Sequence, residues 1–362
     1  MAAVTKRSPV RVRAARPGEG HVIAELWREL WDAHEGWGGY PGCHDDYTYT
    51  QLAARLDDSA RARGGQPALG RHLHVVATLG ETVAGQVEGW VERQGADPQT
   101  PYTCEVRSLI VASWARGAGV GRALLEGLAE FAAPLARGAG LVFGAEVLEP
   151  NPAHAFYGKL GYLPVSWSLR VASDLAAGVP AQARSGIGKP FTARVAEPRD
   201  ALALCLLDAT LAARRRAQGD SRYDRPRAVD AATVGAIAAQ LGPQRFDQGP
   251  GGGTMLQLVT ADGQGQVRGA ATFMVNTLDP PFLRGQRAVL GRFASDPALD
   301  AEALVAPIIA LGRRLAAQAG ARTIELTELA PPSTPLHRAG VASGGVPWSR
   351  ILTRAAPLRG RL

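Results

Sequence analysis

Apolar side chains recur at every second position in short runs and at three- or four-residue spacing in longer ones. The first spacing is typical of strands and the second of amphipathic helices. In the first half of the chain these patterns predict, in order, a strand at Val10–Arg13, a helix over about 19–33, a helix near Tyr49–Arg61, strands at His72–Thr78, Thr82–Val91 and Cys104–Val111, a helix bearing Leu124, Leu125, Leu128, Phe131 and Leu135, and a strand at Leu141–Leu148.

A glycine-rich turn, Arg116-Gly117-Ala118-Gly119-Val120-Gly121, joins the strand at Cys104–Val111 to the helix after it. Backbone N–H groups at a helix start converge on one point, and the helix dipole adds partial positive charge there. Such a turn suits a pyrophosphate. No acidic residue closes a second strand about 20 residues on, so the turn does not resemble a dinucleotide fingerprint.

A second motif runs from Asn151 through Tyr162, directly after the strand at Leu141–Leu148. It has an asparagine, a Phe-Tyr pair, a lysine and a Gly-Tyr ending, in that order. The two motifs together resemble the GNAT superfamily of N-acetyltransferases, whose acyl-CoA pyrophosphate loop is similar to Arg116-x-x-Gly119-x-Gly121. The resemblance is close over roughly residues 105–165. It implies a mixed, largely antiparallel sheet with a splayed central strand, flanked by helices.

The chain also contains a faint internal repeat. Arg13-Ala14-Ala15-Arg16-Pro17-Gly18-Glu19 is echoed by Arg194-Val195-Ala196-Glu197-Pro198-Arg199-Asp200, and two shorter pairs follow at offsets of 180 and 181 positions. A repeat of this length indicates two copies of one domain. We therefore expect two tandem α/β (α+β) domains over 1–175 and 190–362, with an Ala-, Gly- and Pro-containing linker over about 175–190. Strands of the second copy are expected at Thr254–Thr260, Val267–Val275, Gln286–Phe293 and Arg322–Leu326.

The second copy lacks the residues that carry the chemistry. The segment aligned with the glycine turn is Ser295–Glu302, which has no glycine and carries three carboxylates. Carboxylates repel a phosphate, so we expect a degenerate, non-catalytic second domain.

Composition narrows the class of protein. Residues are 46% hydrophobic and 20% charged, as in ordinary globular proteins, and no apolar run approaches the length of a membrane span. The start of the chain does not resemble a signal peptide, and three scattered cysteines do not form a disulfide or zinc framework. The net charge of +7 is not concentrated beside aromatic residues, and the run Arg214–Arg216 is expected to be a solvated helix face. We expect a cytoplasmic protein, monomeric or homodimeric, without metal, nucleic-acid or membrane ligands.

The resemblance implies acetyl-CoA as co-substrate and assigns residues to it. The pantetheine arm would pair with the central strand near Leu109, Ile110 and Val111. The pyrophosphate would bind the turn from Arg116 through Gly117, Ala118, Gly119, Val120 and Gly121 to Arg122. Asn151 would orient the cofactor or a water, besides capping its helix. Tyr157 matches the tyrosine that lies beside the sulfur and acts as general acid; the alternative is a packed aromatic next to Phe156.

The general base is open between three glutamates. Glu105 opens the central strand, where many members of the family place a catalytic glutamate. Glu88 lies on the preceding strand and Glu146 on the following one. A surface charge is the alternative reading of Glu105.

The segment 31–49 is the richest in aromatic and charged residues, among them Glu35, Trp37 and Asp45. In the family this connection forms one wall of the acceptor site. Acidic and aromatic groups attract a cationic amine; a solvated loop is the alternative. We therefore expect an acetyl-CoA-dependent N-acetyltransferase acting on the primary amine of a small molecule. A protein or peptide N-acetyltransferase and a non-catalytic acyl-CoA sensor are the alternatives.

Overall fold

The computed structural model describes residues 9–93, 101–173, 191–223, 227, 229–241, 244–246, 253–278, 280 and 282–355. The chain forms two compact units. Unit 1 consists of residues 1–163, 280–283 and 352–362, and unit 2 of residues 164–279 and 284–351. The linker predicted over 175–190 lies outside the described residues.

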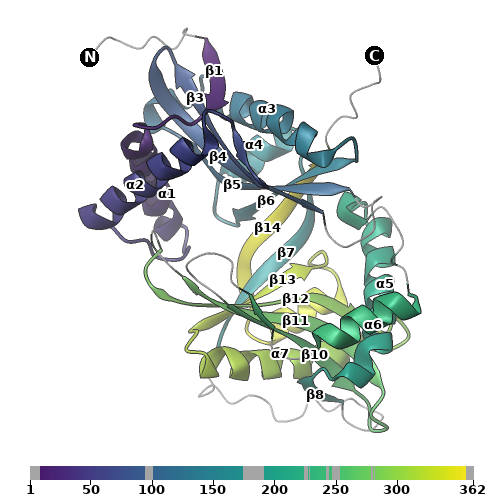
Figure 1. The fold of residues 1–362 in the computed structure, drawn as a ribbon. Coiled ribbons are helices and arrows are strands. Elements are labelled where there is room, and N and C mark those ends of the chain that lie inside the picture. The colour runs from purple at the N-terminus through teal and green to yellow at the C-terminus, as the bar shows by residue number, and fades with distance from the viewer. Residues whose placement is uncertain are drawn as a thin grey trace. The chain divides into compact units, whose positions relative to one another are not determined.

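Unit 1 is built on a sheet with the strand order β1-β3-β4-β5-β6 (Figure 1). Neighbouring strands are antiparallel except for β5 and β6, which are parallel. Its elements are β1 (Val10–Ala14), α1 (Gly20–Gly36), α2 (Asp46–Arg63), β2 (Ala68–Leu69), β3 (His72–Leu79), β4 (Thr82–Arg93), β5 (Tyr102–Val111), α3 (Val120–Ala132), β6 (Leu141–Leu148) and α4 (Ala153–Lys159), with short 3₁₀ turns η1 (Ser113–Ala115) and η2 (Ala133–Ala136).

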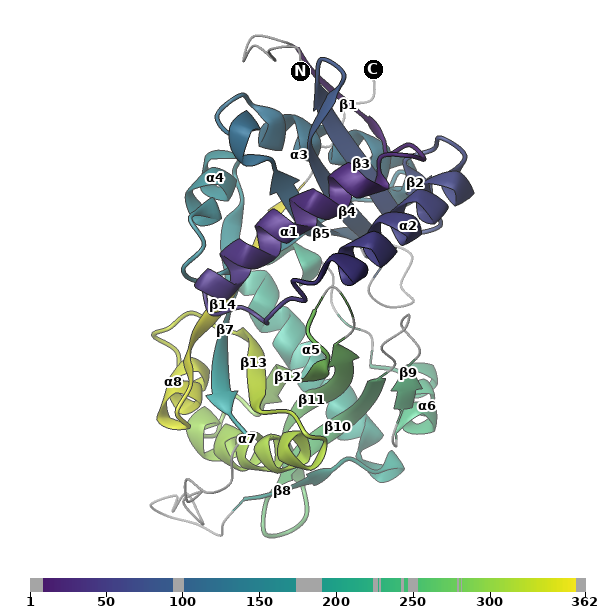
Figure 2. The ribbon, with the colours of Figure 1, turned by 90° about the vertical axis from the view of Figure 1, so that its left-hand side faces the viewer.

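Helices cover both faces of this sheet. Helix α3 packs closely on β4, where a Cβ added to Gly89 would lie 2.7 Å from a methyl carbon of Leu128. A side chain at this crossing would force the Leu128 side chain to move, so glycine lets helix α3 pack closely on β4. Helices α1 and α2 lie side by side on the other face (Figure 2), where Arg63 at the end of α2 contacts His72. This second face carries His74, Glu88 and Trp90, because side chains alternate between faces along a strand.

Unit 2 has the strand order β7-β13-β12-β11-β10-β8, with β9 paired to β10. Helix α5 packs on β11 and β12 and against α6, while α7 packs on the strands β10 to β13. Its elements are β7 (Leu163–Ala172), β8 (Thr192–Val195), η3 (Pro198–Asp200), α5 (Ala201–Ala217), η4 (Ser221–Tyr223), α6 (Ala231–Gln240), β9 (Gln244–Phe246), β10 (Gly253–Ala261), β11 (Val267–Leu278), β12 (Gly285–Ser295), α7 (Ala301–Gln318), β13 (Thr323–Leu329), α8 (Pro335–Ala342) and β14 (Val346–Ala355).

The two halves of the chain repeat the same succession of elements. Helices α1 and α5, strands β3 and β10, and helices α3 and α7 each begin 181 positions apart. Strand β5 of the first copy and strand β12 of the second each contain a residue with positive φ, Ser108 at 49° and Arg292 at 52°. The predicted fold class, two tandem copies of one mixed α/β domain, is therefore confirmed.

The last strand of each copy does not stay with its own half. Strand β7 follows the elements of the first copy but belongs to unit 2 from Pro164 onward. Residues Leu352–Ala355 end strand β14 of the second copy, yet they belong to unit 1. There Arg354 donates from Nη1 to the carbonyl of Leu160 at 3.1 Å and lies over the ring of Tyr162.

The predicted strand at Leu141–Leu148 is found without change, and the other predicted elements of the first copy differ from the observed ones by a few residues at their ends. One expectation about the surface was wrong. Arg215, in the middle of the basic run on α5, is buried and donates from Nη1 to the carbonyl of Val165 at 3.1 Å. A guanidinium that bonds backbone carbonyls is stable in the interior, so a charge run in sequence does not define a solvated face.

Candidate functional site

The glycine turn forms the start of helix α3, as the sequence predicts. Gly117 and Gly119 have φ of 82° and 83°, which only glycine adopts without strain. Gly119 is the N-cap residue, and it has no side chain to accept a hydrogen bond from the first turn of the helix. In a helix the first four N–H groups have no partner within the helix itself. The geometry therefore suits an anion at this point.

The corresponding helix of the second copy is capped by its own side chains. Asp300 is the N-cap of α7, and its Oδ1 accepts from the N–H of Glu302 at 3.0 Å. Asp296 Oδ1 similarly accepts from the N–H of Ala298. The N–H of Glu302 at the start of α7 is therefore bonded by a side chain, and two carboxylates add negative charge there, whereas the turn before α3 carries glycines.

Strands β5 and β6 separate beside the glycine turn. Their parallel pairing runs from Tyr102–Leu141 to Val106–Ala145, although β5 continues to Val111 and β6 to Leu148. The bulge at Ser108 shifts the register of β5 against β4, and Gln86 Nε2 holds the Ser108 carbonyl at 2.6 Å. A bulge bends its strand, so the predicted splay at Leu109 to Val111 is present.

The two sequence motifs meet at Gly121. A Cβ on this residue would lie 3.1 Å from a ring carbon of Phe156 on helix α4. Helix α4 is thereby placed against the first turn of α3, so the third glycine of the turn allows the two helices to approach. Arg116 and Arg122 are both exposed, and Arg116 directs Nε toward the Val111 carbonyl at 3.4 Å. Two exposed cations therefore flank the turn, and Arg116 Nη2 also lies 3.9 Å from Glu29 Oε2.

Asn151 and Tyr157 lie at the start and in the body of α4. Asn151 Oδ1 accepts from the N–H of Ala153 at 2.9 Å, so its predicted helix-capping contact is present. The Tyr157 ring is buried between Phe156 and Tyr162, with ring centroids at 5.3 and 5.1 Å. Burial raises the pKa of the Tyr157 hydroxyl above its usual value. The hydroxyl therefore keeps its proton throughout the neutral range.

The three candidate bases have different surroundings. Glu105 is half exposed on the face of the sheet that carries Trp90, and its Oε2 accepts from Arg107 Nη2 at 2.6 Å. Glu146 is exposed on β6. Glu88 lies deeper, with its Oε2 3.7 Å from His72 Nε2. Burial alone would raise the pKa of Glu88, but the contact with His72 and the charges of His74 and Arg63 lower it.

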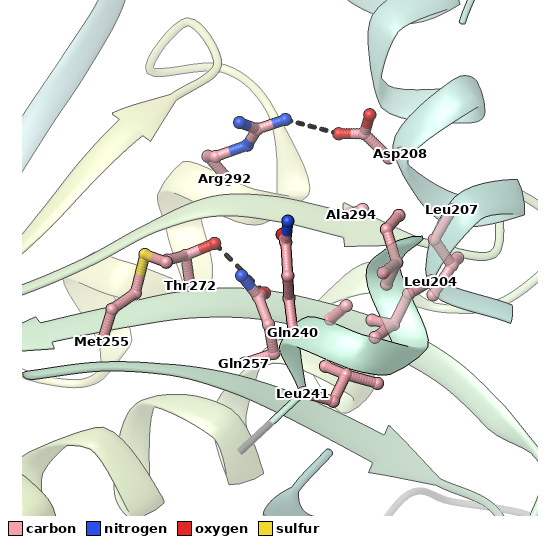
Figure 3. A pocket seen from close by; sticks show the side chains of 12 residues that line it. Leu204, Leu207, Asp208, Gln240, Leu241, Met255, Gln257, Thr272, Arg292 and Ala294 are labelled. Atoms are coloured by element: carbon pink, nitrogen blue, oxygen red, sulfur yellow. Dashed lines mark hydrogen bonds and ion pairs between the residues drawn. The ribbon is translucent and has the colours of Figure 1, made fainter. Parts of the chain in front are cut away.

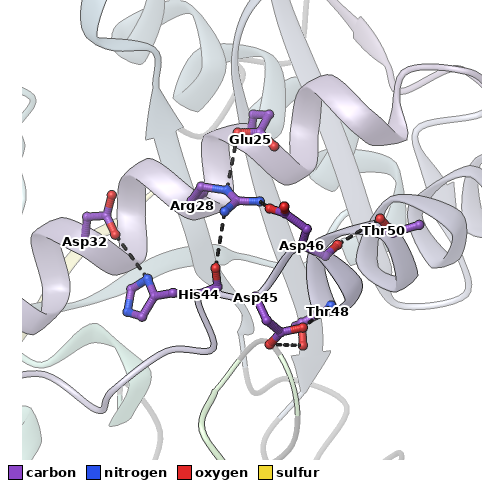
Figure 4. Close-up of polar contacts among 8 residues, drawn as sticks. All are labelled: Glu25, Arg28, Asp32, His44, Asp45, Asp46, Thr48 and Thr50. Atoms are coloured by element: carbon purple, nitrogen blue, oxygen red, sulfur yellow. Dashed lines mark hydrogen bonds and ion pairs between the residues drawn. The ribbon is translucent and has the colours of Figure 1, made fainter.

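The segment between α1 and α2 is held by its own polar contacts (Figure 4). His44 contacts Asp32 at 3.3 Å, as Figure 4 shows. His44 also contacts Glu35 at 3.0 Å, and Glu35 accepts from the N–H of Gly42. Asp45 accepts from the N–H and the hydroxyl of Thr48, so it caps α2. These bonds lower the pKa of Glu35 and of Asp45. Both carboxylates are therefore ionised at neutral pH.

Aromatic rings complete this segment. Trp37 lies at the end of α1 with its ring 5.6 Å from that of His34, and Trp31 is buried. The ring of Phe282, from the connection between β11 and β12, packs on Trp31 within unit 1. Sequence reasoning missed Phe282, because no local pattern shows that a residue so far along the chain belongs to this unit.

Sequence reasoning also missed a buried polar cluster on the α1/α2 face of the sheet. His72 and His74 alternate with apolar residues on β3, and Arg63 Nη2 lies 2.9 Å from His72 Nδ1. His74 is fully buried, and burial lowers its pKa to about 4. Two histidines at alternate positions of an otherwise apolar strand were the available signal.

Within the described ranges, no cluster of three or more His, Cys, Asp or Glu side chains is arranged to hold a metal ion. The described helices include none long and apolar enough to cross a membrane.

Residues 23–162 match the model of the acetyltransferase (GNAT) family. They contain the glycine turn, the splayed strands and the α4 motif, so this part of the chain is similar to members of the acetyltransferase (GNAT) family.

Solved structures resemble nearly the whole chain. A tandem GNAT protein from the clavulanic acid biosynthesis pathway is 18% identical, over 96% of this chain and 98% of that one, with a TM-score of 0.49. A GCN5-related N-acetyltransferase from Sphaerobacter thermophilus is 16% identical, over 96% and 95% of the two chains, also with a TM-score of 0.49. A GCN5-related glucosamine N-acetyltransferase region of a fungal multi-domain β-N-acetylglucosaminidase is 14% identical, over 96% of this chain and 38% of that one, with a TM-score of 0.53. At this level of identity the likeness concerns the fold alone. A comparison with curated proteins gave no match.

Proposed function

We propose that unit 1 transfers an acetyl group from acetyl-CoA to the primary amine of a small molecule. The observation that carries this proposal is the contact between Gly121 and Phe156, because it brings the anion-binding turn and the buried tyrosine helix together. Strand β5 leads into the turn and strand β6 leads into α4, and the separation of these two strands fits an extended acyl arm.

The residues that would hold acetyl-CoA follow from this geometry. The N–H groups from Gly117 to Arg122 would bind the pyrophosphate, with Arg116 and Arg122 adding charge-assisted contacts. The backbone of Leu109 to Val111 would pair with the pantetheine amides as an added strand does. When bound, acetyl-CoA supplies an acyl thioester for the amine to attack.

Tyr157 would supply a proton from its hydroxyl to the departing sulfur. A buried phenol with a raised pKa remains protonated at neutral pH, as a general acid must. Its packing between two aromatic rings fixes the ring, so the hydroxyl has a defined direction.

Glu105 would remove the proton from the acceptor ammonium, directly or through water. It is exposed to solvent on the face of the sheet that carries Trp90. Arg107, at 2.6 Å, keeps the carboxylate oriented. An alkyl ammonium group with a pKa of about 10.4 must lose a proton before its nitrogen can attack the thioester.

The α1–α2 connection would bind the acceptor. Glu35 is ionised and Trp37 offers an aromatic face, and both groups attract a cationic amine. Asp45 is engaged in capping α2, so we assign it to the wall that shapes this segment.

The test is a steady-state acetyl-CoA assay against polyamines, aminoglycosides, amino acids and short peptides. We expect turnover with at least one small amine, with kcat/KM at least tenfold above that for any peptide. A preference for peptides would contradict the small-molecule assignment. Tight binding of acetyl-CoA without turnover of any acceptor would instead favour a sensor.

A further inference from the structure

Unit 2 contains a pocket of its own, with a volume of about 220 Å³ (Figure 3). Helices α5 and α6 form one side, and strands β10, β11 and β12 form the other. Apolar side chains make up much of the lining, including Leu204, Leu207, Ile237 and Leu241. None of these residues has a role in the chemistry proposed for unit 1.

The pocket occupies the place in the second copy that the α1/α2 face of the sheet has in the first. Met255 and Gln257, which line it, lie 181 positions after His74 and Val76. The cross-strand pair Gln257–Thr272 likewise corresponds to Val76–Gln86. The second copy has thus lost the anion-binding turn but keeps a cavity on the face where the first copy would receive its acceptor.

The size of the pocket limits its ligand. An apolar cavity of about 150 Å³ holds benzene, and pockets for drug-sized molecules begin at about 300 Å³. A volume of about 220 Å³ lies between these values. It suits a molecule somewhat larger than benzene.

A pair of opposite charges lies at one side of the pocket. Arg292 Nη2 donates to Asp208 Oδ1 at 2.6 Å, and Figure 3 shows this pair apart from the leucine side chains. Arg227 Nε lies 3.7 Å from the other oxygen of Asp208. The remaining donors of Arg292 are suited to a carboxylate, and Asp208 is suited to an ammonium group.

We propose that this pocket binds a free α-amino acid with a large apolar side chain, such as leucine, methionine or phenylalanine. The ligand carboxylate bonds Arg292, its ammonium group bonds Asp208, and its side chain lies among Leu204, Leu207 and Leu241. An uncharged ligand would form no charge-assisted bond with this pair, and a dianion would be repelled by Asp208. Unit 2 would bind this ligand without acetylating it, because the side chains of Asp296 and Asp300 bond N–H groups at and before the start of α7, where the donor pyrophosphate would bind.

Calorimetric titration of the full chain with L-leucine tests the proposal. Two analogues serve as matched ligands: 3-methylbutylamine, which lacks the carboxylate, and 4-methylpentanoate, which lacks the amine. We expect one leucine per chain, bound at least tenfold more tightly than either analogue. No detectable binding at 10 mM leucine, or equal affinity for all three compounds, would overturn the proposal.

Single substitutions locate the site. Arg292→Gln should abolish the preference for leucine over the amine, and Asp208→Asn should abolish the preference for leucine over the acid. Arg268→Gln is the control, because Arg268 lies on the neighbouring strand, pairs with Asp262 and does not line the pocket. Leucine affinity unchanged in the first two variants would place the binding elsewhere and refute the proposal.

Two further variants show whether a loss of leucine binding comes from the pocket itself, from misfolding, or from binding to the acceptor segment of unit 1. Ile237→Trp fills the pocket from α6 and should remove leucine binding while circular dichroism remains native. Trp37→Ala, in the segment of unit 1 proposed to bind the acceptor, should leave leucine binding intact. Loss of leucine binding in Trp37→Ala with retention in Ile237→Trp would show that leucine binds unit 1 as an acceptor, and the proposal would fail although the proposed function would stand.

Discussion

The ring of Phe282 packs on the ring of Trp31, with centroids 4.5 Å apart. The backbone of Phe282 also forms an isolated β-bridge with Gly42, and the next residue, Leu283, donates its N–H to the Pro41 carbonyl at 2.8 Å. Phe282 comes from the second copy, whereas Trp31, Pro41 and Gly42 belong to the segment proposed to bind the acceptor. The second copy therefore contributes structure to the acceptor side of unit 1.

Phe282→Ala should weaken acceptor binding and leave donor binding unchanged. An aromatic pair contributes about 1 kcal/mol beyond its buried area, which corresponds to a roughly fivefold rise in acceptor KM. Leu283→Ala is the matched control, because the Leu283 side chain is exposed. An equal rise of KM in both variants, or a change in acetyl-CoA affinity, would contradict this role. Steady-state kinetics with each substrate varied in turn provide the measurement.

Gly119→Val should abolish acetyl-CoA binding. A branched side chain both blocks the turn and strains a backbone with φ of 83°, at a cost of about 1–3 kcal/mol in the free energy of unfolding. Gly138→Val controls for this strain, because Gly138 has φ of 80° and lies beyond the opposite end of α3. We expect similar losses of stability in urea unfolding, but normal calorimetric acetyl-CoA binding for the Gly138 variant. Normal binding in both would argue against the loop assignment.

Tyr157→Phe should reduce kcat by about 10²–10⁴-fold, the usual contribution of general acid catalysis, with acetyl-CoA affinity within a few-fold. The loss should shrink with an acyl donor whose thiol has a lower pKa, because that leaving group needs less protonation. Tyr162→Phe is the matched control, since its ring lies beside Tyr157 and its own pKa is raised to about 12. A wild-type kcat in Tyr157→Phe, or the same loss with both donors, would leave Tyr157 as a packing residue.

Glu105→Gln and Glu88→Gln separate the two candidate bases. If Glu105 is the base, its variant should lose about 10²–10⁴-fold in kcat at neutral pH. Raising the pH should restore part of that loss, because more of the free amine forms without help. Glu88→Gln should keep kcat within a few-fold. A loss of kcat in Glu88→Gln that is partly restored at high pH, with a nearly unchanged kcat in Glu105→Gln, would instead identify Glu88 as the base.

His74 should make the protein less stable in mild acid. Burial lowers its pKa to about 4, whereas in the unfolded chain it is about 6.5. The unfolded state then binds more protons between these two values, so the free energy of unfolding decreases as the pH falls through this window. The decrease is about 3 kcal/mol at most, from about 1.4 kcal/mol per pH unit.

Urea unfolding at pH 7 and pH 5 measures this effect. His74→Leu should reduce the difference between the two pH values, whereas replacement of the exposed His21 should not. A pH dependence unchanged by His74→Leu would assign it to other groups.

The sequence was sufficient to predict the fold class and the glycine turn at the start of α3. Two local signals, glycine at a strand-to-helix turn and alternation along β5, and one long-range signal, the 181-position offset that recurs at α1 and α5, carried these predictions. The splay between β5 and β6 came from family resemblance rather than from spacing.

The remaining features depend on contacts between distant residues. Phe282 reaches Trp31 only through the folded chain, and the partner carbonyl of Arg215 belongs to Val165. The cap formed by Asp45 on α2 is a local signal that was available, since Thr48 follows three positions later. The polar residues around Asp45 in the sequence instead suggested a binding loop.

The last strand of each copy belongs wholly or partly to the other unit, and this has a consequence for the folding of each half. Because β7 belongs to unit 2 and the end of β14 to unit 1, neither half contains all the strands of its own sheet. Deletion of the second copy would leave unit 1 without Leu352–Ala355 and without Phe282, and an unpaired sheet edge promotes aggregation. A chain cut after the first copy should therefore unfold at lower urea concentration than the full chain, even though no catalytic role is proposed for unit 2.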